Sequence, residues 1–158
     1  MFDKGLGELF VLRVAGNVVD DSHGMLGSAE YAVLYLKVPL IVVMGHENCG
    51  AVSAVLHGKK VRGNLGRLLK SIHVGKDLPK DEKAAVAAAT QANTLFQAGE
   101  MVLQSDILKE FAESGRVLIV PAVYSLSTGE VTWLDPIRTK PRAPKAKAKP
   151  PAGEARGK

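Results

Sequence analysis

The chain has a single cysteine, Cys49, among its 158 residues. One cysteine excludes a framework of intrachain disulfides, and with it the small secreted domains that depend on such bridges. No apolar run approaches the roughly 20 residues that span a bilayer, and no charged-then-apolar signal sequence stands at the amino end. We therefore expect a cytoplasmic protein that does not enter a membrane.

Acidic residues are nearly absent from the carboxyl-terminal stretch. From Arg138 onward eight Lys and Arg residues accompany only Glu154, a net charge of +7, which leaves −2 for residues 1–137. Residues 138–158 are rich in Pro, Ala and Lys and have little to bury, so we predict a disordered basic tail. Because the basic character belongs to this tail, nucleic acid is not an expected partner of the domain at residues 1–137.

Hydrophobic residues make up 46% of the chain, enough for one domain with a real core. They fall into short apolar runs, which predict strands, and into patterns with helical spacing. The expected strands are Leu9–Val14, Leu40–Met44 and Val117–Val120, with Val131–Leu134 returning antiparallel. The expected helices are Leu26–Lys37, Ala51–Leu56, Asn64–Ile72, Asp81–Ala98 and Glu100–Ser114.

This alternation predicts an α/β domain of three layers, with a mainly parallel sheet and an antiparallel edge strand. Leu9–Val14 and Leu40–Met44 should form a parallel pair through a right-handed crossover. Asp81 is a candidate N-cap, and Gly99 is expected to stop a helix. Pro121 cannot donate to a ladder, which predicts a strand end or edge there.

The strand expected at Leu40–Met44 leads directly to the most informative residues. Gly45 is expected to end it with a sharp turn, and His46 and Cys49 follow, three positions apart. Ligands of open α/β sheets lie beyond the carboxyl ends of the strands, and an imidazole beside a thiolate there suits zinc. The alternative is that Cys49 is a small core residue, because zinc needs more than two protein ligands.

Other polar residues are weaker candidates. His57 and His73 stand in polar turns, which indicates surface histidines rather than ligands. Asp20 or Asp21 could replace a metal ligand, but loop carboxylates are usually solvated.

With these residues laid out, the chain resembles the β-class carbonic anhydrases. Four collinear segments carry the resemblance: Gly7–Asn17, Ser28–Val33, Gly45–Val52 and Ala122–Val131. The resemblance implies a zinc enzyme that interconverts carbon dioxide and bicarbonate, built as a homodimer or tetramer. It matches His46 and Cys49 to two of the family's three zinc ligands, and Gly50 to the glycine beside the substrate. Three protein ligands leave a fourth position for the reacting water.

The same resemblance places Arg13 and Asn17 near the family's dimer interface and substrate cleft, although a polar strand end is a simpler account of both. In the family a Cys-x-Asp-x-Arg segment supplies the third ligand and an Asp–Arg pair, upstream of the residues matching Phe2 and Asp3. The present sequence holds no such segment, so no catalytic pair is identifiable in it.

That segment forms the family's first strand, between the strands matching Leu9–Val14 and Leu40–Met44. Without it the two neighbours would pair directly or lose a ladder, at roughly 1–3 kcal/mol for each unpaired buried group. We therefore expect the natural protein to begin earlier. As written, the chain is expected to bind zinc weakly and to hydrate carbon dioxide poorly, if at all. The alternative is a non-catalytic, dimerising relative that kept the fold and lost the site.

Overall fold

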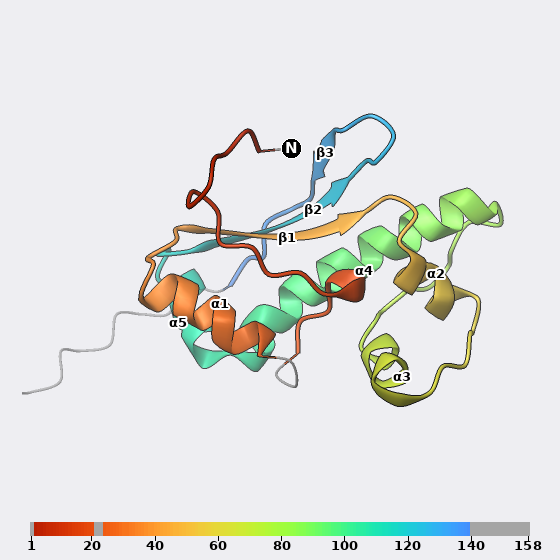
Figure 1. Ribbon diagram of the computed structural model, residues 1–158, viewed down its shortest axis with the longest axis horizontal. Helices are drawn as coiled ribbons and strands as arrows, with labels where there is room; N and C mark the ends of the chain where they lie inside the picture. Colours follow the sequence, from red (N-terminus) through yellow and green to blue (C-terminus); the bar gives the residue numbers. More distant parts are fainter. Residues whose placement is uncertain (1, 21–23, 140–158) are drawn as a thin grey trace, which may run out of the picture.

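The computed structural model describes residues 2–20 and 24–139 of the chain (Figure 1). Its elements in chain order are η1 (Ala15–Asn17), α1 (Met25–Leu34), β1 (Leu40–His46), α2 (Gly50–Leu56), α3 (Gly63–Lys70), α4 (Glu82–Gln104), α5 (Asp106–Glu113), β2 (Leu118–Tyr124) and β3 (Val131–Trp133). The predicted tail lies outside the described residues, apart from Arg138 and Thr139. No helix of the described part is long and apolar enough to cross a membrane.

A three-stranded sheet in the order β1-β2-β3 organises the domain. β1 and β2 are parallel, in a register that runs from Leu40 opposite Leu118 to His46 opposite Tyr124. β2 and β3 form the predicted antiparallel hairpin. The α/β class with a parallel pair and an antiparallel edge strand is therefore confirmed.

The helices lie on one side of the sheet, with the long α4 running beneath β1 and β2 (Figure 1). One core cluster joins α1, α4 and α5 to the sheet through residues such as Val33, Met101, Leu108 and Ile119. A second cluster joins α2 and α3 to α4. In the described residues no helix covers the opposite face of the sheet, so the predicted third layer is not built from helices there.

The strand predicted at Leu9–Val14 is wrong, because these residues are irregular and most of them are exposed. The exposed fractions of Val11 and Leu9 are 64% and 49%. An apolar run becomes a strand only where another strand offers it a ladder. Among the described residues β1 pairs with β2 alone, and the Leu9–Val14 segment does not lie along its free outer edge. The parallel unit is therefore β1 and β2, joined by α2 to α5, and not the expected pair.

The predicted helix boundary at Gly99 is also wrong. α4 continues through Gly99 to Gln104, because Ala98 and Met101 on either side are both buried in the core. The break comes at Ser105, whose hydroxyl caps α5 by accepting from the Leu108 N–H at 3.1 Å. The predicted N-cap is confirmed, since Asp81 Oδ1 accepts from the Ala84 N–H at 2.8 Å.

Pro121 lies inside β2, the central strand, and not at a strand end or edge. It is fully buried opposite Val43, and its carbonyl accepts from the Leu134 N–H at 2.9 Å. Proline has no backbone N–H, but its carbonyl can still accept a hydrogen bond. A central strand therefore tolerates Pro121, because its contact with the next strand uses the carbonyl.

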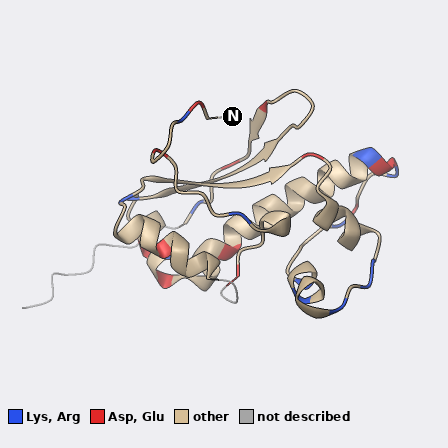
Figure 2. Ribbon diagram, in the orientation of Figure 1, with Lys and Arg blue, Asp and Glu red and all other residues tan. Residues whose placement is uncertain are grey.

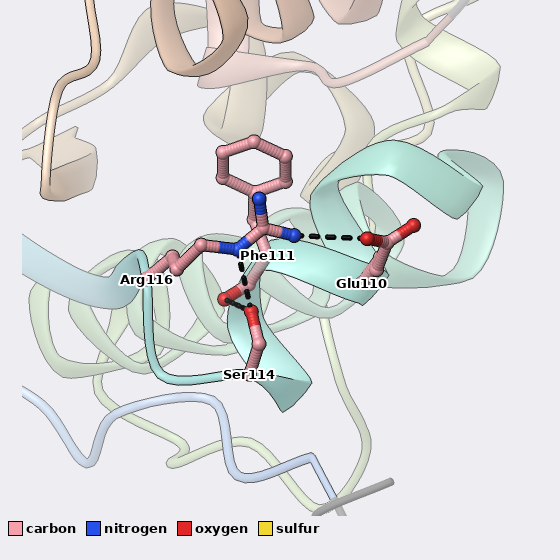
Figure 3. A network of polar contacts seen from close by, with 4 residues as sticks. All are labelled: Glu110, Phe111, Ser114 and Arg116. Carbon is pink, nitrogen blue, oxygen red and sulfur yellow. Dashed lines mark hydrogen bonds and ion pairs between the residues drawn. The ribbon is translucent and has the colours of Figure 1, made fainter. Parts of the chain in front are cut away.

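The turn from α5 into β2 is held by Arg116 (Figure 3). Its guanidinium donates to Glu110 Oε1 and to Ser114 Oγ, each at 2.9 Å, and lies 3.7 Å from the centre of the Phe111 ring. These contacts close the carboxyl end of the helix and set the point where the chain enters the central strand.

Candidate metal centre

The candidate centre lies where β1 ends and the chain turns into α2. The ladder extends one residue past the strand, since the Glu47 N–H donates to the Tyr124 carbonyl at 2.8 Å. Asn48 then takes a left-handed conformation with φ of 54°, and Cys49 follows as the N-cap residue of α2. The predicted turn at Gly45 is wrong, because Gly45 is part of β1 and the positive φ belongs to Asn48.

Gly45 is needed for a different reason, the close approach of α4. A Cβ at this position would overlap Thr94 Oγ1 and press on Thr90 Cγ2. Thr94 is fully buried, and its hydroxyl donates to the Thr90 carbonyl at 2.8 Å. The absence of a side chain at Gly45 therefore lets the strand that carries His46 lie directly on the helix.

His46 is exposed, and one of its ring nitrogens is already engaged. Nδ1 lies 2.9 Å from the Glu47 carbonyl oxygen, which can only accept a hydrogen bond. In the neutral ring this contact requires the proton on Nδ1, because the carbonyl oxygen cannot donate, and the lone pair is then on Nε2. A histidine fixed in this way by a backbone carbonyl has the tautomer and orientation of a metal ligand.

Cys49 is 4% exposed and carries a free thiol. Its side chain packs in the second core cluster, with Val18, Val52, Leu69, Ile72 and Ala89. The structure thus places Cys49 as the core residue of the alternative interpretation, three positions after His46 at the end of β1. A soft sulfur next to an imidazole nitrogen fits zinc by donor chemistry.

These donors are only part of a zinc site. Within residues 2–20 and 24–139, no three His, Cys, Asp or Glu side chains come together in a way that could hold a metal ion. Asp20 therefore does not complete the set, and Asp21 lies outside the described residues. His57 and His73 are exposed, as the sequence predicts.

Gly50, the candidate substrate-binding residue, is the first residue of α2 and is exposed. A Cβ placed on it would meet no atom within 4 Å. There is therefore open space beside Gly50, and packing among the described residues does not require a glycine at this position.

Glu47 is the residue of this loop that sequence reasoning missed. Its Oε2 accepts from the Ser127 N–H at 3.1 Å, the Ser127 hydroxyl at 3.0 Å and the Ser125 hydroxyl at 3.1 Å. The carboxylate thereby ties the loop that carries His46 and Cys49 to the β2–β3 hairpin. These hydrogen bonds, led by the Ser127 hydroxyl, hold the pKa of Glu47 below its ordinary value, with Lys83 adding a small attraction.

This lowered pKa gives Glu47→Gln a pH signature. The carboxylate stabilises the fold above pH 4.5, its ordinary pKa, and the contribution is lost as the pH falls through the lower folded value. We expect Glu47→Gln to unfold at lower denaturant than the unsubstituted chain at neutral pH, and the gap to close in acid. Urea unfolding from about pH 7 to about pH 3 measures it. Glu113→Gln, on α5, is the control. We call the contacts of Glu47 with Ser125 and Ser127 the Glu47 clamp. A difference in denaturant midpoint that does not change with pH would contradict it.

A stripe of buried polar side chains on α4 holds the segment around η1 in place. Its members are Thr90, Asn93, Thr94 and Gln97. Asn93 donates to the Gly16 carbonyl at 2.7 Å and accepts from the His73 N–H at 3.0 Å. Gln97 donates to the Ser71 carbonyl at 2.6 Å and accepts from the Val19 N–H at 2.7 Å. The irregular segment around η1 is thus held against α4 by side chains that the Ala-rich sequence gave no reason to single out.

Arg13 and Asn17, which the resemblance placed near the family's dimer interface and substrate cleft, differ in their surroundings. Arg13 is exposed in the irregular segment. Asn17, with φ of 44°, accepts from Asn93 Nδ2 at 3.3 Å, while its own Nδ2 is buried without a hydrogen-bond partner among the described residues.

A protein-family model described as carbonic anhydrase matches residues 1–131. The chain belongs to the β-class carbonic anhydrase family. Carbonic anhydrase 2 of Mycobacterium tuberculosis (strain H37Rv) is 37% identical over 145 residues, which cover 87% of this chain and 68% of the relative. The carbonic anhydrase of Mycolicibacterium smegmatis is 37% identical over 139 residues, which cover 83% of this chain and 65% of that relative. The chain therefore spans about two thirds of these carbonic anhydrases.

Solved carbonic anhydrases share the fold. The Coccomyxa β-carbonic anhydrase in complex with acetazolamide superimposes with a TM-score of 0.75 at 28% identity, over 86% of this chain and 65% of that one. One of two tetrameric β-carbonic anhydrases from Sordaria macrospora also superimposes with a TM-score of 0.75, at 24% identity, over 85% of this chain and 72% of that one. The sheet and helices that carry His46 and Cys49 are thus those of a carbonic anhydrase, and the family predicted from four short segments is confirmed.

Proposed function

We propose that this carbonic anhydrase chain binds zinc through His46 and Cys49 and serves the reversible hydration of carbon dioxide to bicarbonate. The observation that supports it is the pair itself: a histidine with a free Nε2 and a lone thiol, three residues apart at the carboxyl end of β1. When bound, zinc would act as the Lewis acid that polarises the reacting water.

The residues of this chain would divide the remaining work. His46 Nε2 and Cys49 Sγ hold the metal, and the Glu47 clamp fixes the loop between them against the β2–β3 hairpin. The open space at Gly50 admits a small substrate in front of the loop. A rigid loop matters because a metal ligand displaced by even a fraction of an ångström loses affinity.

A non-catalytic, dimerising carbonic-anhydrase-like protein is the second candidate. What favours it is that no three His, Cys, Asp or Glu side chains of the described residues come together in a way that could hold a metal ion. Three exposed aromatic side chains, Phe10, Tyr31 and Tyr35, form a surface that could serve such dimerisation. The ring centres of Phe10 and Tyr31 are 6.4 Å apart, and those of Tyr31 and Tyr35 are 5.2 Å apart. We propose that this surface takes part in a homo-oligomer in either case, and that the protein is cytoplasmic.

Zinc content with paired variants tests the proposal. We expect the purified chain to bind zinc weakly, and His46→Ala and Cys49→Ser each to lower that affinity by about tenfold or more, since each removes one of two donors. His73→Ala, another exposed histidine, should have no effect. Competition with a chromogenic chelator gives the affinities, and stopped-flow hydration is expected to be slow for want of a third ligand. Zinc binding that is unaffected by both variants would overturn the proposed ligands, whatever the hydration rate.

A further inference from the structure

The loop between α2 and α3 and the first turn of α3 stand out from the rest of the fold (Figure 1). We call these residues, 57–65, the α3 tip, and every one of them is exposed. Behind the tip, α3 is anchored by Leu69 and Ile72, which pack in the second core cluster. A well-anchored helix thus carries a tip that its own domain does not cover.

The backbone of the α3 tip has a defined shape. Gly58 and Gly63 turn the chain with φ of 62° and 70°. A Cβ at Gly66 would overlap the Val61 carbonyl, so the missing side chain lets the loop lie directly on α3. Val61 and Leu65 are therefore held at the same end of the helix, with exposed fractions of 39% and 51%. Two aliphatic side chains presented to solvent on a fixed backbone are suited to contact with an apolar partner.

The α3 tip lies in a strongly basic part of the chain. Residues 57–76 contain six Lys and Arg and no Asp or Glu, and the other residues of 1–137 carry a net charge of −8, because 1–137 as a whole has −2. In the part of the chain that the structure describes, none of the six forms an ion pair. Figure 2 shows these cations around α3 and the loop before it, with acidic residues on α1 and α5. Lys59, Lys60 and Arg62 flank Val61 directly, so the tip combines unpaired positive charge with exposed aliphatic side chains.

We propose that the α3 tip binds the surface of an anionic lipid bilayer. Lys59, Lys60 and Arg62 would lie among the negative headgroups, and Val61 and Leu65 would enter the boundary between headgroups and acyl chains. The long apolar stems of lysine let the ammonium groups stay at the headgroups while the backbone approaches. Contact of this kind holds a protein on a membrane surface and needs no helix that crosses it.

The side chains of the α3 tip fit lipid better than nucleic acid. A phosphodiester backbone would attract the same cations, but it offers nothing to Val61 and Leu65. Residues 57–76 contain no Phe, Tyr or Trp on which an unpaired base could stack. A bilayer meets both the charge and the aliphatic side chains, which is why we choose it as the partner.

Cosedimentation of the full chain with lipid vesicles tests the electrostatic part. We expect binding to vesicles of phosphatidylserine and phosphatidylcholine in equal amounts, and little binding to phosphatidylcholine alone. Lys59→Gln combined with Lys60→Gln should weaken binding by about tenfold or more. Lys37→Gln combined with Lys109→Gln removes the same charge from two exposed lysines outside the tip, and should weaken binding by less than about twofold. Because both double variants keep the basic residues 138–158, a difference between them belongs to the tip.

Leu65→Ser tests the apolar part. It should weaken binding to the same vesicles by about fivefold, since a half-exposed leucine no longer enters the lipid boundary. Leu103→Ser on α4 is the matched control, because Leu103 is 77% exposed and lies outside the tip, and it should leave binding unchanged. Binding of a single-stranded oligonucleotide should not respond to Leu65→Ser.

Three results would overturn the proposal: equal vesicle binding by the two double variants, vesicle binding unchanged by Leu65→Ser, or an oligonucleotide that binds more tightly than the vesicles and depends on Lys59 and Lys60. The last result would assign the α3 tip to nucleic acid. All the substituted side chains are exposed, so the variants should fold, which circular dichroism verifies. Since the readout needs neither zinc nor hydration, its failure is distinct from failure of the proposed function.

Discussion

Asn93→Leu is expected to lower the free energy of unfolding by about 2–6 kcal/mol. Leucine fills a similar volume but leaves the His73 N–H and the Gly16 carbonyl without their partner, and each such group costs roughly 1–3 kcal/mol. A domain of this size has a net stability of about 5–15 kcal/mol, so this single change could leave much of the chain unfolded at equilibrium. Urea unfolding followed by circular dichroism measures the effect.

The control for Asn93→Leu is Gln91→Leu, which makes nearly the same chemical change on the exposed face of the same helix. We expect Gln91→Leu to alter the free energy of unfolding by no more than about 0.5 kcal/mol. Equal losses from the two variants would mean that the polar stripe of α4 does not anchor the segment around η1.

Gly45→Ala is expected to cost about 1–3 kcal/mol of unfolding free energy and to weaken metal binding at the neighbouring His46. The added methyl group overlaps Thr94 Oγ1, and Thr94 is a stiff, fully buried side chain that cannot rotate away freely. The strand must therefore separate from α4, and the loop that begins one residue later moves with it.

A double-mutant cycle identifies the contact responsible. Thr94→Ala removes the overlapping hydroxyl, so we expect Gly45→Ala to cost much less in that background. Gly27→Ala, in α1, adds a methyl group where nothing lies within 4 Å, and should be neutral or slightly stabilising. If Gly45→Ala costs the same with and without Thr94, the close approach of strand and helix is not what requires the glycine.

The parts of the fold that could be predicted are those set by local sequence. The apolar run at Leu40–Met44 and the N-cap at Asp81 are each specified by neighbours in the chain, and both lie as predicted. The hairpin at β2 and β3 was predicted for the same reason.

The failures come from partners far away in the chain. Leu9–Val14 has the composition of a strand, but its conformation depends on whether another strand lies beside it, and none does in the described residues. Gly99 has the composition of a helix stop, but burial of its neighbours Ala98 and Met101 carries the helix past it. Glu47 and Ser127 are 80 positions apart, so no spacing rule could join them into a clamp.

The free side of β1 affects how the protein should be handled. Along this seven-residue strand, backbone N–H and C=O groups on the side away from β2 have no partner among the described residues, and the side chains there are mostly apolar. An open strand of this kind is a template for extended segments of other molecules, which is the first step of ordered aggregation. This polypeptide should therefore precipitate more readily as its concentration rises, and a lysine or proline placed on that side would be the natural way to keep it in solution.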